Sequence, residues 1–261
     1  MKHSIQIFLF IFGGLFSISS SAGPLQTTPE VIKLAVSISI PPFFIKELDS
    51  GIEMEIIKES FAQVGYQILP IFYIDKPRIA AFVNKDVACA STIPSQTEIK
   101  GFLSDPVITL ETTAITLTEK NFKIDHVSDL ANKNIIAFKG AKKILGPSFN
   151  EVVANNLHYR ERLKNAIQPV LLYRKRVEVV LSDPIIFDYF RLQMASQLDI
   201  EQPITIHHIF TPKNFHLICH SNDLIQAFNT GLAKIRAEGL IPKLYQRLMQ
   251  PPPAQTVDTP S

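Results

Sequence analysis

The sequence predicts an α/β protein built from two similar halves. Short runs rich in β-branched and aromatic residues alternate with segments of helical periodicity, which is the pattern of a parallel sheet covered by helices. The same alternation begins again after residues 104–106, which we interpret as a loop. The hydrophobic content of 46% is high enough to support a real core.

The first half follows the order strand, helix, strand, helix, strand. We expect the three strands at residues 31–38, 67–74 and 87–91. The first helix is predicted from apolar residues that recur every three or four positions, and Gly65 ends it; these residues are Met54, Ile57, Phe61 and Val64. Pro77 fits the first turn of a short second helix that runs to residue 83.

The second half begins with an alternating strand at residues 112–118. Further strands are expected at residues 134–138, 177–181, 204–210 and 215–220, and helices at 169–173 and 184–194. The last strong pattern places Ile225, Phe228, Leu232 and Ile235 on one helical face, and a shorter helix follows to about residue 248.

The N-terminal residues have the pattern of a cleaved secretory signal. Lys2 and His3 precede an apolar run at residues 5–16, and small residues follow up to Ala22. The run is too short to cross the ~30 Å hydrocarbon core of a membrane. We expect cleavage after Ala22 and, because no cysteine precedes Cys89, a periplasmic protein without a lipid anchor.

Composition excludes some partners. The formal net charge is +2 and no basic run occurs, so nothing indicates a nucleic-acid surface. No apolar run after the N-terminus is long enough for a membrane span. Residues 250–261 contain three consecutive prolines and no large apolar side chain except Val257, so we expect a disordered tail.

Several local motifs occur in a recognisable order. They are the aromatic loop at residues 39–43, the glycine and alternating acidic residues at 51–55, the segment 73–78 ending in Arg78, the Ser-Asp-Pro segment at 103–106, and the strand 176–183 ending in Asp183. In this order they resemble family 3 of the periplasmic solute-binding proteins, the polar amino acid type. The resemblance covers roughly residues 31–248.

The resemblance implies the two-lobe periplasmic binding protein fold of type II, with each lobe a sheet flanked by helices. Lobe 1 would comprise residues 23–113 and 212–249, and lobe 2 residues 114–211. The chain would cross between the lobes near residues 112–118 and 204–215. Two such crossings allow hinge closure around a ligand.

Phe43 and Asp183 are the first ligand-binding residues that the resemblance implies. An aromatic ring at the mouth of a cleft can lie on a ligand and exclude water. A carboxylate at the carboxyl end of a strand can accept hydrogen bonds from a ligand amine. The alternatives are that Phe43 packs on its own lobe and that Asp183 caps the helix that begins at Pro184.

Gly140 and Ala141 form a turn after a strand, where backbone N–H groups can hold a carboxylate. The family usually has serine or threonine where this chain has Ala141. Thr92, at the end of the third strand, completes this set of predicted ligand-binding residues.

The main departure from the family lies between residues 93 and 100. Amino acid binders of the family have an arginine that grips the ligand carboxylate where this chain has Thr97, and a threonine where it has Pro94. Lys100 is near, but a point charge does not replace a bidentate guanidinium. Arg78 is a second candidate source of charge, unless it is a surface arginine at a helix start. The standard amino acid ligand is therefore in doubt.

Histidine and cysteine patterns do not predict a metal site. His207 and His208 are neighbours on a strand and face opposite sides, while His216 and His220 would lie about 13 Å apart on one face. The resemblance implies that Cys89 and Cys219 lie in adjacent strands of lobe 1, in a compartment that permits a disulfide. Because cross-strand geometry is restrictive and buried free cysteine is common, we expect free thiols.

The resemblance implies a monomeric solute-binding protein that captures a small polar solute, with an amine-bearing solute as one candidate, for ABC-type uptake or sensing. Its further partner would be an inner-membrane permease or receptor, and we expect no cofactor. The chain lacks a G-x-S-x-G, Walker or H-E-x-x-H motif, so we expect no enzyme activity. The alternatives are a dehydratase-like enzyme on the same fold and a ligand-sensing subunit of a membrane receptor.

Overall fold

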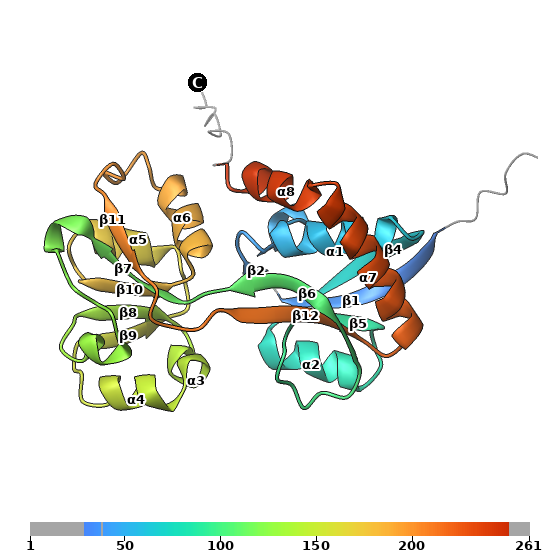
Figure 1. Cartoon of the computed structure of the whole chain (residues 1–261), viewed down its shortest axis with the longest axis horizontal. Coiled ribbons are helices and arrows are strands. Elements are labelled where there is room, and N and C mark those ends of the chain that lie inside the picture. The colour runs from blue at the N-terminus through green and yellow to red at the C-terminus, as the bar shows by residue number, and fades with distance from the viewer. Residues whose placement is uncertain (1–28, 38, 251–261) are drawn as a thin grey trace, which may run out of the picture.

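The computed structural model describes residues 29–37 and 39–250, which form two lobes side by side (Figure 1). The predicted signal at residues 1–22 and nearly all of the predicted tail lie outside the described residues. Within the described ranges, no helix is both long and apolar enough to cross a membrane.

Lobe 1 contains a five-stranded sheet whose strands come from both ends of the described chain. Its order is β4 (Tyr66–Tyr73), β1 (Glu30–Ser37), β5 (Cys89–Pro94), β12 (Lys213–Cys219) and β6 (Phe102–Leu110). Strands β4, β1 and β5 are parallel, and β12 runs antiparallel to both of its neighbours. A short hairpin of β2 (Ser39–Ile40) and β3 (Phe44–Ile45), then a single turn, η1 (Lys46–Leu48), follow β1.

Helices cover both faces of this sheet (Figure 1). Helix α2 (Asp75–Val83) lies on one face, and α1 (Ile52–Ala62), α7 (Asn222–Ala237) and α8 (Leu240–Leu248) lie on the other. Because strand side chains alternate, Ala35 packs with the α2 side while Leu34 and Val36 pack with the α1 side. Burial on both faces explains why β1 is a nearly continuous apolar run.

Lobe 2 contains a second five-stranded sheet, formed by the middle of the chain. Its order is β11 (Ile204–His207), β7 (Thr113–Leu117), β10 (Val179–Ser182), β8 (Ile135–Phe138) and β9 (Tyr159–Arg162). Strands β10, β8 and β9 are parallel. The helices of this lobe are α3 (Ala141–Leu145), α4 (Pro147–Val153), α5 (Ile167–Tyr173) and α6 (Pro184–Gln193), with single turns η2 (Thr118–Lys120) and η3 (Val127–Leu130).

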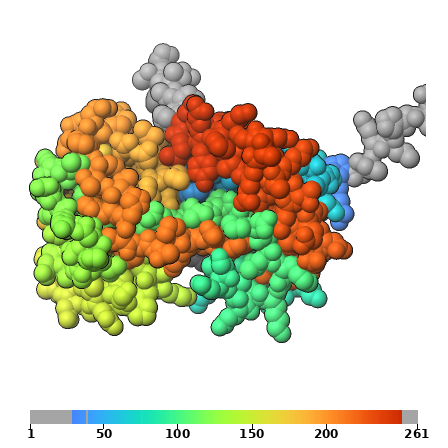
Figure 2. Space-filling model, viewed as in Figure 1, coloured from blue at the N-terminus to red at the C-terminus, as the bar shows by residue number. Residues whose placement is uncertain are grey.

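The chain passes between the lobes twice, from β6 to β7 and from β11 back to β12 (Figure 1). The lobes also touch through side chains, since Ile186 of α6 belongs to the same apolar cluster as Phe43 and Phe44 of lobe 1. Met249, just after α8, lines a small pocket with Pro184 and Ile185 of lobe 2. Figure 2 shows the red C-terminal helix meeting the gold and orange surface of lobe 2 at this place.

The predicted α/β fold with two lobes is confirmed, as are most of the expected strands and helices. The loop predicted at residues 104–106 is wrong, because β6 runs through it. Proline is tolerated there since β6 is an edge strand and its register with β12 shifts beside Pro106. The predicted strand at 204–210 ends earlier, at His207.

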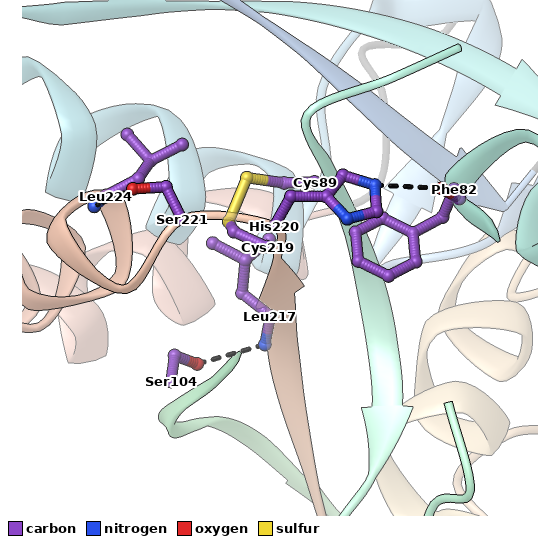
Figure 3. The surroundings of a disulfide bond; sticks show 8 residues. All are labelled: Phe82, Cys89, Ser104, Leu217, Cys219, His220, Ser221 and Leu224. Atoms are coloured by element: carbon purple, nitrogen blue, oxygen red, sulfur yellow. Dashed lines mark hydrogen bonds between the residues drawn. A yellow bond between two sulfur atoms is a disulfide. The ribbon is translucent and has the colours of Figure 1, made fainter. Parts of the chain in front are cut away.

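The expectation of free thiols is also wrong. Cys89 of β5 and Cys219 of β12 form a disulfide (Figure 3). The antiparallel register sets the two residues directly opposite each other, with their Cα atoms 4.2 Å apart. Both cysteines are fully buried. The bond therefore links β12, the strand that follows the second crossing, covalently to β5 in the N-terminal part of lobe 1.

Candidate functional site

Three of the predicted ligand-binding residues, Thr92, Gly140 and Asp183, lie near the carboxyl ends of parallel strands of the two lobes. Thr92 lies near the end of β5 and Asp183 directly follows β10. Gly140 follows β8 and opens α3, on the side of lobe 2 that faces α2 in Figure 1. Open α/β sheets bind ligands at this edge. The site would therefore lie between the lobes.

Phe43 lies in the loop between β2 and β3 and is only 1% exposed. Its ring meets the ring of Tyr245 of α8 edge to face, with centroids 6.5 Å apart. The carbonyl of Phe43 accepts a hydrogen bond from the backbone N–H of Glu53, so the loop docks on the start of α1. This close approach requires Gly51, where a Cβ would lie 2.3 Å from that carbonyl oxygen. Phe43 is packed on its own lobe.

A buried polar cluster lies beneath this loop. The Glu53 carboxylate is fully buried and accepts hydrogen bonds of 3.0 Å from both the backbone N–H and the hydroxyl of Thr92. Thr92 adopts a left-handed backbone with φ of 56°, which is strained for a β-branched residue. That conformation lets both of its donors reach the same carboxylate.

Burial raises the pKa of Glu53 to about 7, although the Thr92 hydrogen bonds and the charge of Arg78 act in the opposite direction. Arg78, one turn into α2, donates from Nη1 to the carbonyl oxygen of Ser91. It is therefore not a surface arginine. Its guanidinium belongs to the same polar cluster as Glu53 and Thr92, at the strand end where a ligand would bind.

Tyr245 of α8 is partly buried and packs on Phe43. Burial is the largest cause that raises the pKa of its hydroxyl to about 12, with smaller contributions from the negative charges of Asp183 and Glu53. Tyr245 thus brings a phenol from the C-terminal helix to the loop that carries Phe43.

Asp183 caps the N-terminus of α6, the structural role given above as the alternative to ligand binding. Its Oδ1 accepts from the backbone N–H groups of Ile185 and Ile186 at the start of α6, at 2.9 and 3.3 Å. Its Oδ2 accepts from the N–H of Glu111, in the first crossing, at 2.9 Å. Burial raises the pKa of Asp183 despite these hydrogen bonds. The residue connects lobe 2 to the crossing.

The turn at Gly140 and Ala141 already holds a carboxylate, which comes from the chain itself. Glu161 at the end of β9 accepts hydrogen bonds from the backbone N–H groups of Gly140, at 2.7 Å, and Lys142, at 3.1 Å. The hydroxyl of Tyr159 donates to the same side chain at 2.8 Å. Burial alone would raise the pKa of Glu161, but these hydrogen bonds lower it. Ala141 is fully buried.

Thr97 and Lys100 make other contacts. The Thr97 hydroxyl accepts a local hydrogen bond from the N–H of Ile99. Lys100 lines a shallow pocket of ≈ 510 Å³ with Lys85 and His220. Val83, the last residue of α2, also lines that pocket, whereas Arg78 is near the first turn of the helix. Lys100 is therefore at the wrong end of α2 to supply charge to the strand ends.

Among the described residues, no group of three histidine, cysteine or acidic side chains is arranged to hold a metal ion. The histidines of the return segment have separate partners. His207 contacts Thr116, His216 contacts Ser95 and Ser104, and His220 stacks on Phe82.

Comparison with solved structures identifies the fold. AbpA of Streptococcus pneumoniae, an amino acid ABC transporter substrate-binding protein bound to L-arginine, matches with a TM-score of 0.59 and 16% identity over 84% of this chain and 94% of its own. A histidine kinase sensor domain with similarity to periplasmic binding proteins matches with a TM-score of 0.63 and 10% identity over 86% and 99%. The chain has the periplasmic binding protein fold.

The ancestral amino acid-binding protein AncCDT-1, described as a precursor of cyclohexadienyl dehydratase, shares this binding-protein fold. It matches with a TM-score of 0.62 and 17% identity over 84% of this chain and 96% of its own. No family model and no curated protein matches the sequence.

Two residues of the candidate site were not singled out from the sequence. Glu53 belonged to a recognised motif, and its position two residues after Gly51 was the available signal. Tyr245 gave no signal, because it reaches Phe43 through the packing of α8 on α1 and α7.

Proposed function

We propose that this chain is a periplasmic solute-binding protein of the family 3 type, which captures a small polar solute between its lobes for ABC-type uptake or sensing. The observation that carries the proposal is the arrangement of two separate sheets joined by two crossings, with Thr92 and Asp183 near the carboxyl ends of strands in different lobes. Such a hinge suits capture and release. The likeness of this fold to AbpA and AncCDT-1, which are amino acid-binding proteins, supports it.

The remaining parts of the proposal follow from the sequence. Lobe 1 would comprise residues 23–113 and 212–249, and lobe 2 residues 114–211. The mature protein would begin after Ala22, carry no lipid, remain monomeric and deliver its solute to an inner-membrane permease or receptor. Ligand contacts would come from the predicted residues, with Glu53 and Tyr245 added to them; the predicted residues are Phe43, Arg78, Thr92, Thr97, Gly140, Ala141 and Asp183.

An enzyme on the same fold is the second candidate, and AncCDT-1 is the reason to test it. A buried carboxyl with a pKa of about 7, such as Glu53, is suited to proton transfer at neutral pH. However, Glu53 is fully buried and both donors of Thr92 point to it, an arrangement that favours a binding or structural role. We therefore propose binding without turnover.

A solute screen on the secreted chain, stripped of bound solute, tests the function. Amino acids, polyamines, organic acids and small sugars are screened by thermal shift, and each hit is followed by small-angle X-ray scattering. A true ligand raises Tm by mass action and makes the protein more compact. If no solute does both, the proposal is wrong. Recovery of the hit by mass spectrometry, unchanged after incubation, separates binding from an enzymatic reaction.

A further inference from the structure

The outer edge of lobe 2 carries exposed cations that form no ion pair with an acidic side chain of the described residues. Strand β9 is the last strand of its sheet and pairs only with β8, so its other side faces outward (Figure 1). In this part of the chain Lys175 pairs with Glu119 at 2.7 Å. The other exposed cations form a set that we call the basic edge, and they are Arg160, Arg162, Lys164, Arg174 and Arg176.

The strand alternation and one asparagine bring these cations together. Tyr159 packs with the apolar cluster of α4, so Arg160 and Arg162 point to the opposite face of the sheet, which α5 covers. The side-chain amide of Asn134 links this strand to the segment after α5. It accepts from Nη2 of Arg160 at 3.0 Å and donates to the carbonyl oxygen of Arg176 at 3.0 Å. Cations from two separate segments therefore share one surface.

The acidic residue of β9 does not neutralise this surface. Glu161 lies between two of these arginines in the sequence, but neighbouring side chains on a strand point to opposite faces. Its carboxylate accepts from the N–H groups of Gly140 and Lys142 and from the hydroxyl of Tyr159. The basic edge therefore keeps its positive charge, although the formal net charge of the whole chain is only +2.

Two leucines project from the ends of β9. Leu157 is 92% exposed and Leu163 is 76% exposed, more than any other large apolar side chain of the described residues. A single apolar side chain beside cations can enter the boundary between headgroups and acyl chains of a bilayer while the cations meet anionic headgroups. A protein partner would need a contiguous apolar patch instead. The pockets at the end of α2 and beside α6 include no residue of this edge.

We propose that the basic edge, with Leu157 and Leu163, docks lobe 2 on the surface of an anionic phospholipid bilayer. The charges supply attraction to the headgroups and the leucines supply apolar burial. The inference goes beyond the proposed function and requires no solute, because the residues that carry it lie at the outer edge of the lobe 2 sheet.

Flotation of the secreted chain with lipid vesicles measures this docking. Vesicles of phosphatidylcholine alone are compared with vesicles that contain about one third phosphatidylglycerol. We expect the chain to float with the anionic vesicles only, and rising salt should release it because salt screens exposed charges. A chain that stays in solution with the anionic vesicles at low salt, or floats equally with both kinds, would overturn the inference.

A charge variant and its matched control locate the surface. The double variant Arg160→Gln, Arg162→Gln should weaken vesicle binding about 10- to 30-fold, because each cation near an anionic surface contributes to the affinity. The double variant Lys234→Gln, Lys243→Gln makes the same change in net charge on exposed positions of α7 and α8 and should bind like wild type. Equal binding by the two variants would contradict the inference.

The leucines are tested separately from the charges. The double variant Leu157→Ser, Leu163→Ser should weaken binding to anionic vesicles about 10-fold or more, since it removes the apolar burial and leaves every charge in place. Leu48→Ser, Leu69→Ser changes two exposed leucines of lobe 1 and serves as the control. Thermal unfolding verifies that all variants fold. Wild-type binding by the folded Leu157→Ser, Leu163→Ser variant would contradict the inference.

Soluble polyglutamate distinguishes a membrane from an acidic protein partner. If polyglutamate binds and anionic vesicles do not, the basic edge takes an acidic protein and the inference is wrong. The vesicle measurements use no solute, so a failed solute screen would count against the proposed function alone, and failed flotation would count against this inference alone.

Discussion

The imidazole Nδ1 of His208 lies 2.8 Å from a carboxylate oxygen of Glu111, and this pair joins the two crossings of the chain. Glu111 also donates its backbone N–H to Asp183 of lobe 2. The first crossing is thus held on one side by the second crossing and on the other by the cap of α6. The hinge is therefore a small hydrogen-bonded network.

Asp183→Ala should destabilise the protein by about 1–2 kcal/mol, because it removes the cap of α6 and the acceptor for Glu111. His208→Gln should change stability by less than about 1 kcal/mol, since the side chain of His208 is largely exposed. Urea unfolding of both variants measures the difference. An equal loss of stability in the two variants would mean that the Asp183 cap contributes no more than the His208–Glu111 pair.

Glu53 should make stability fall as pH rises. Its pKa is about 7 in the folded protein against an ordinary value of 4.5, so the folded state holds a proton that the unfolded chain releases. The stabilisation is fully present below about pH 4.5 and is lost as pH rises through 7, about 3 kcal/mol in total. Glu53→Gln should flatten this part of the stability profile between pH 5 and 8, measured by denaturant unfolding. Glu55→Gln should keep the slope, and an unchanged slope in Glu53→Gln would refute this assignment.

Removal of the disulfide should lower stability substantially. A sequence separation of 130 residues corresponds to roughly 5 kcal/mol in a chain-entropy model, and measured losses for native disulfides are typically about 2–5 kcal/mol. The double variant Cys89→Ala, Cys219→Ala should therefore unfold at lower denaturant than the wild type. Reductant should reproduce most of the loss in the wild type and have no effect on the double variant. If the double variant and the wild type unfold together under oxidising conditions, the bond contributes nothing.

Gly231→Ala should be among the more damaging substitutions on α7. An added Cβ would lie 1.8 Å from the backbone oxygen of Ser60 on α1, so the two helices would have to separate. The gain of about 1 kcal/mol in helix propensity does not offset overpacking, and we expect a net loss of about 2 kcal/mol or more. Thr230→Ala, at an exposed neighbouring position, serves as the control and should lie within about 0.5 kcal/mol of wild type. Thermal unfolding compares the two variants.

The N-terminus of the secreted protein should be Gly23, without a lipid. The small residues up to Ala22 and the absence of any cysteine before Cys89 are the basis of this prediction. Intact-mass spectrometry of periplasmic extract measures it directly. An acylated terminus or a retained Met1 would contradict both the signal and the proposed compartment.

The fold was largely predictable from the sequence because the spacing of apolar residues shows which side of a helix or strand is buried. The apolar faces of α1 and α7 and the continuous runs of β1 and β10 depend on which side chains meet the core, and a local pattern records that. Strand β6 was missed since Asp105-Pro106 normally marks a turn, and only its place at the sheet edge tolerates the proline.

The site was predicted less completely, for a different reason. The role of Gly140 depends on Glu161, which reaches the turn only because β9 pairs in register with β8. The contact between Tyr245 and Phe43 depends on how α8 packs on α1. The pairing of Cys89 with Cys219 depends on a register that two isolated sequence segments do not specify. Contacts of this kind are set by tertiary structure and leave no local signature.

The bond between Cys89 and Cys219 encloses every strand of lobe 2 in one covalent ring. A protease that cuts once within lobe 2 therefore opens the ring without dividing the molecule. The nicked protein would migrate as a single species without reductant and as two fragments after reduction. Lobe 2 can in this way suffer a backbone break while β12, α7 and α8 stay attached to the rest of lobe 1.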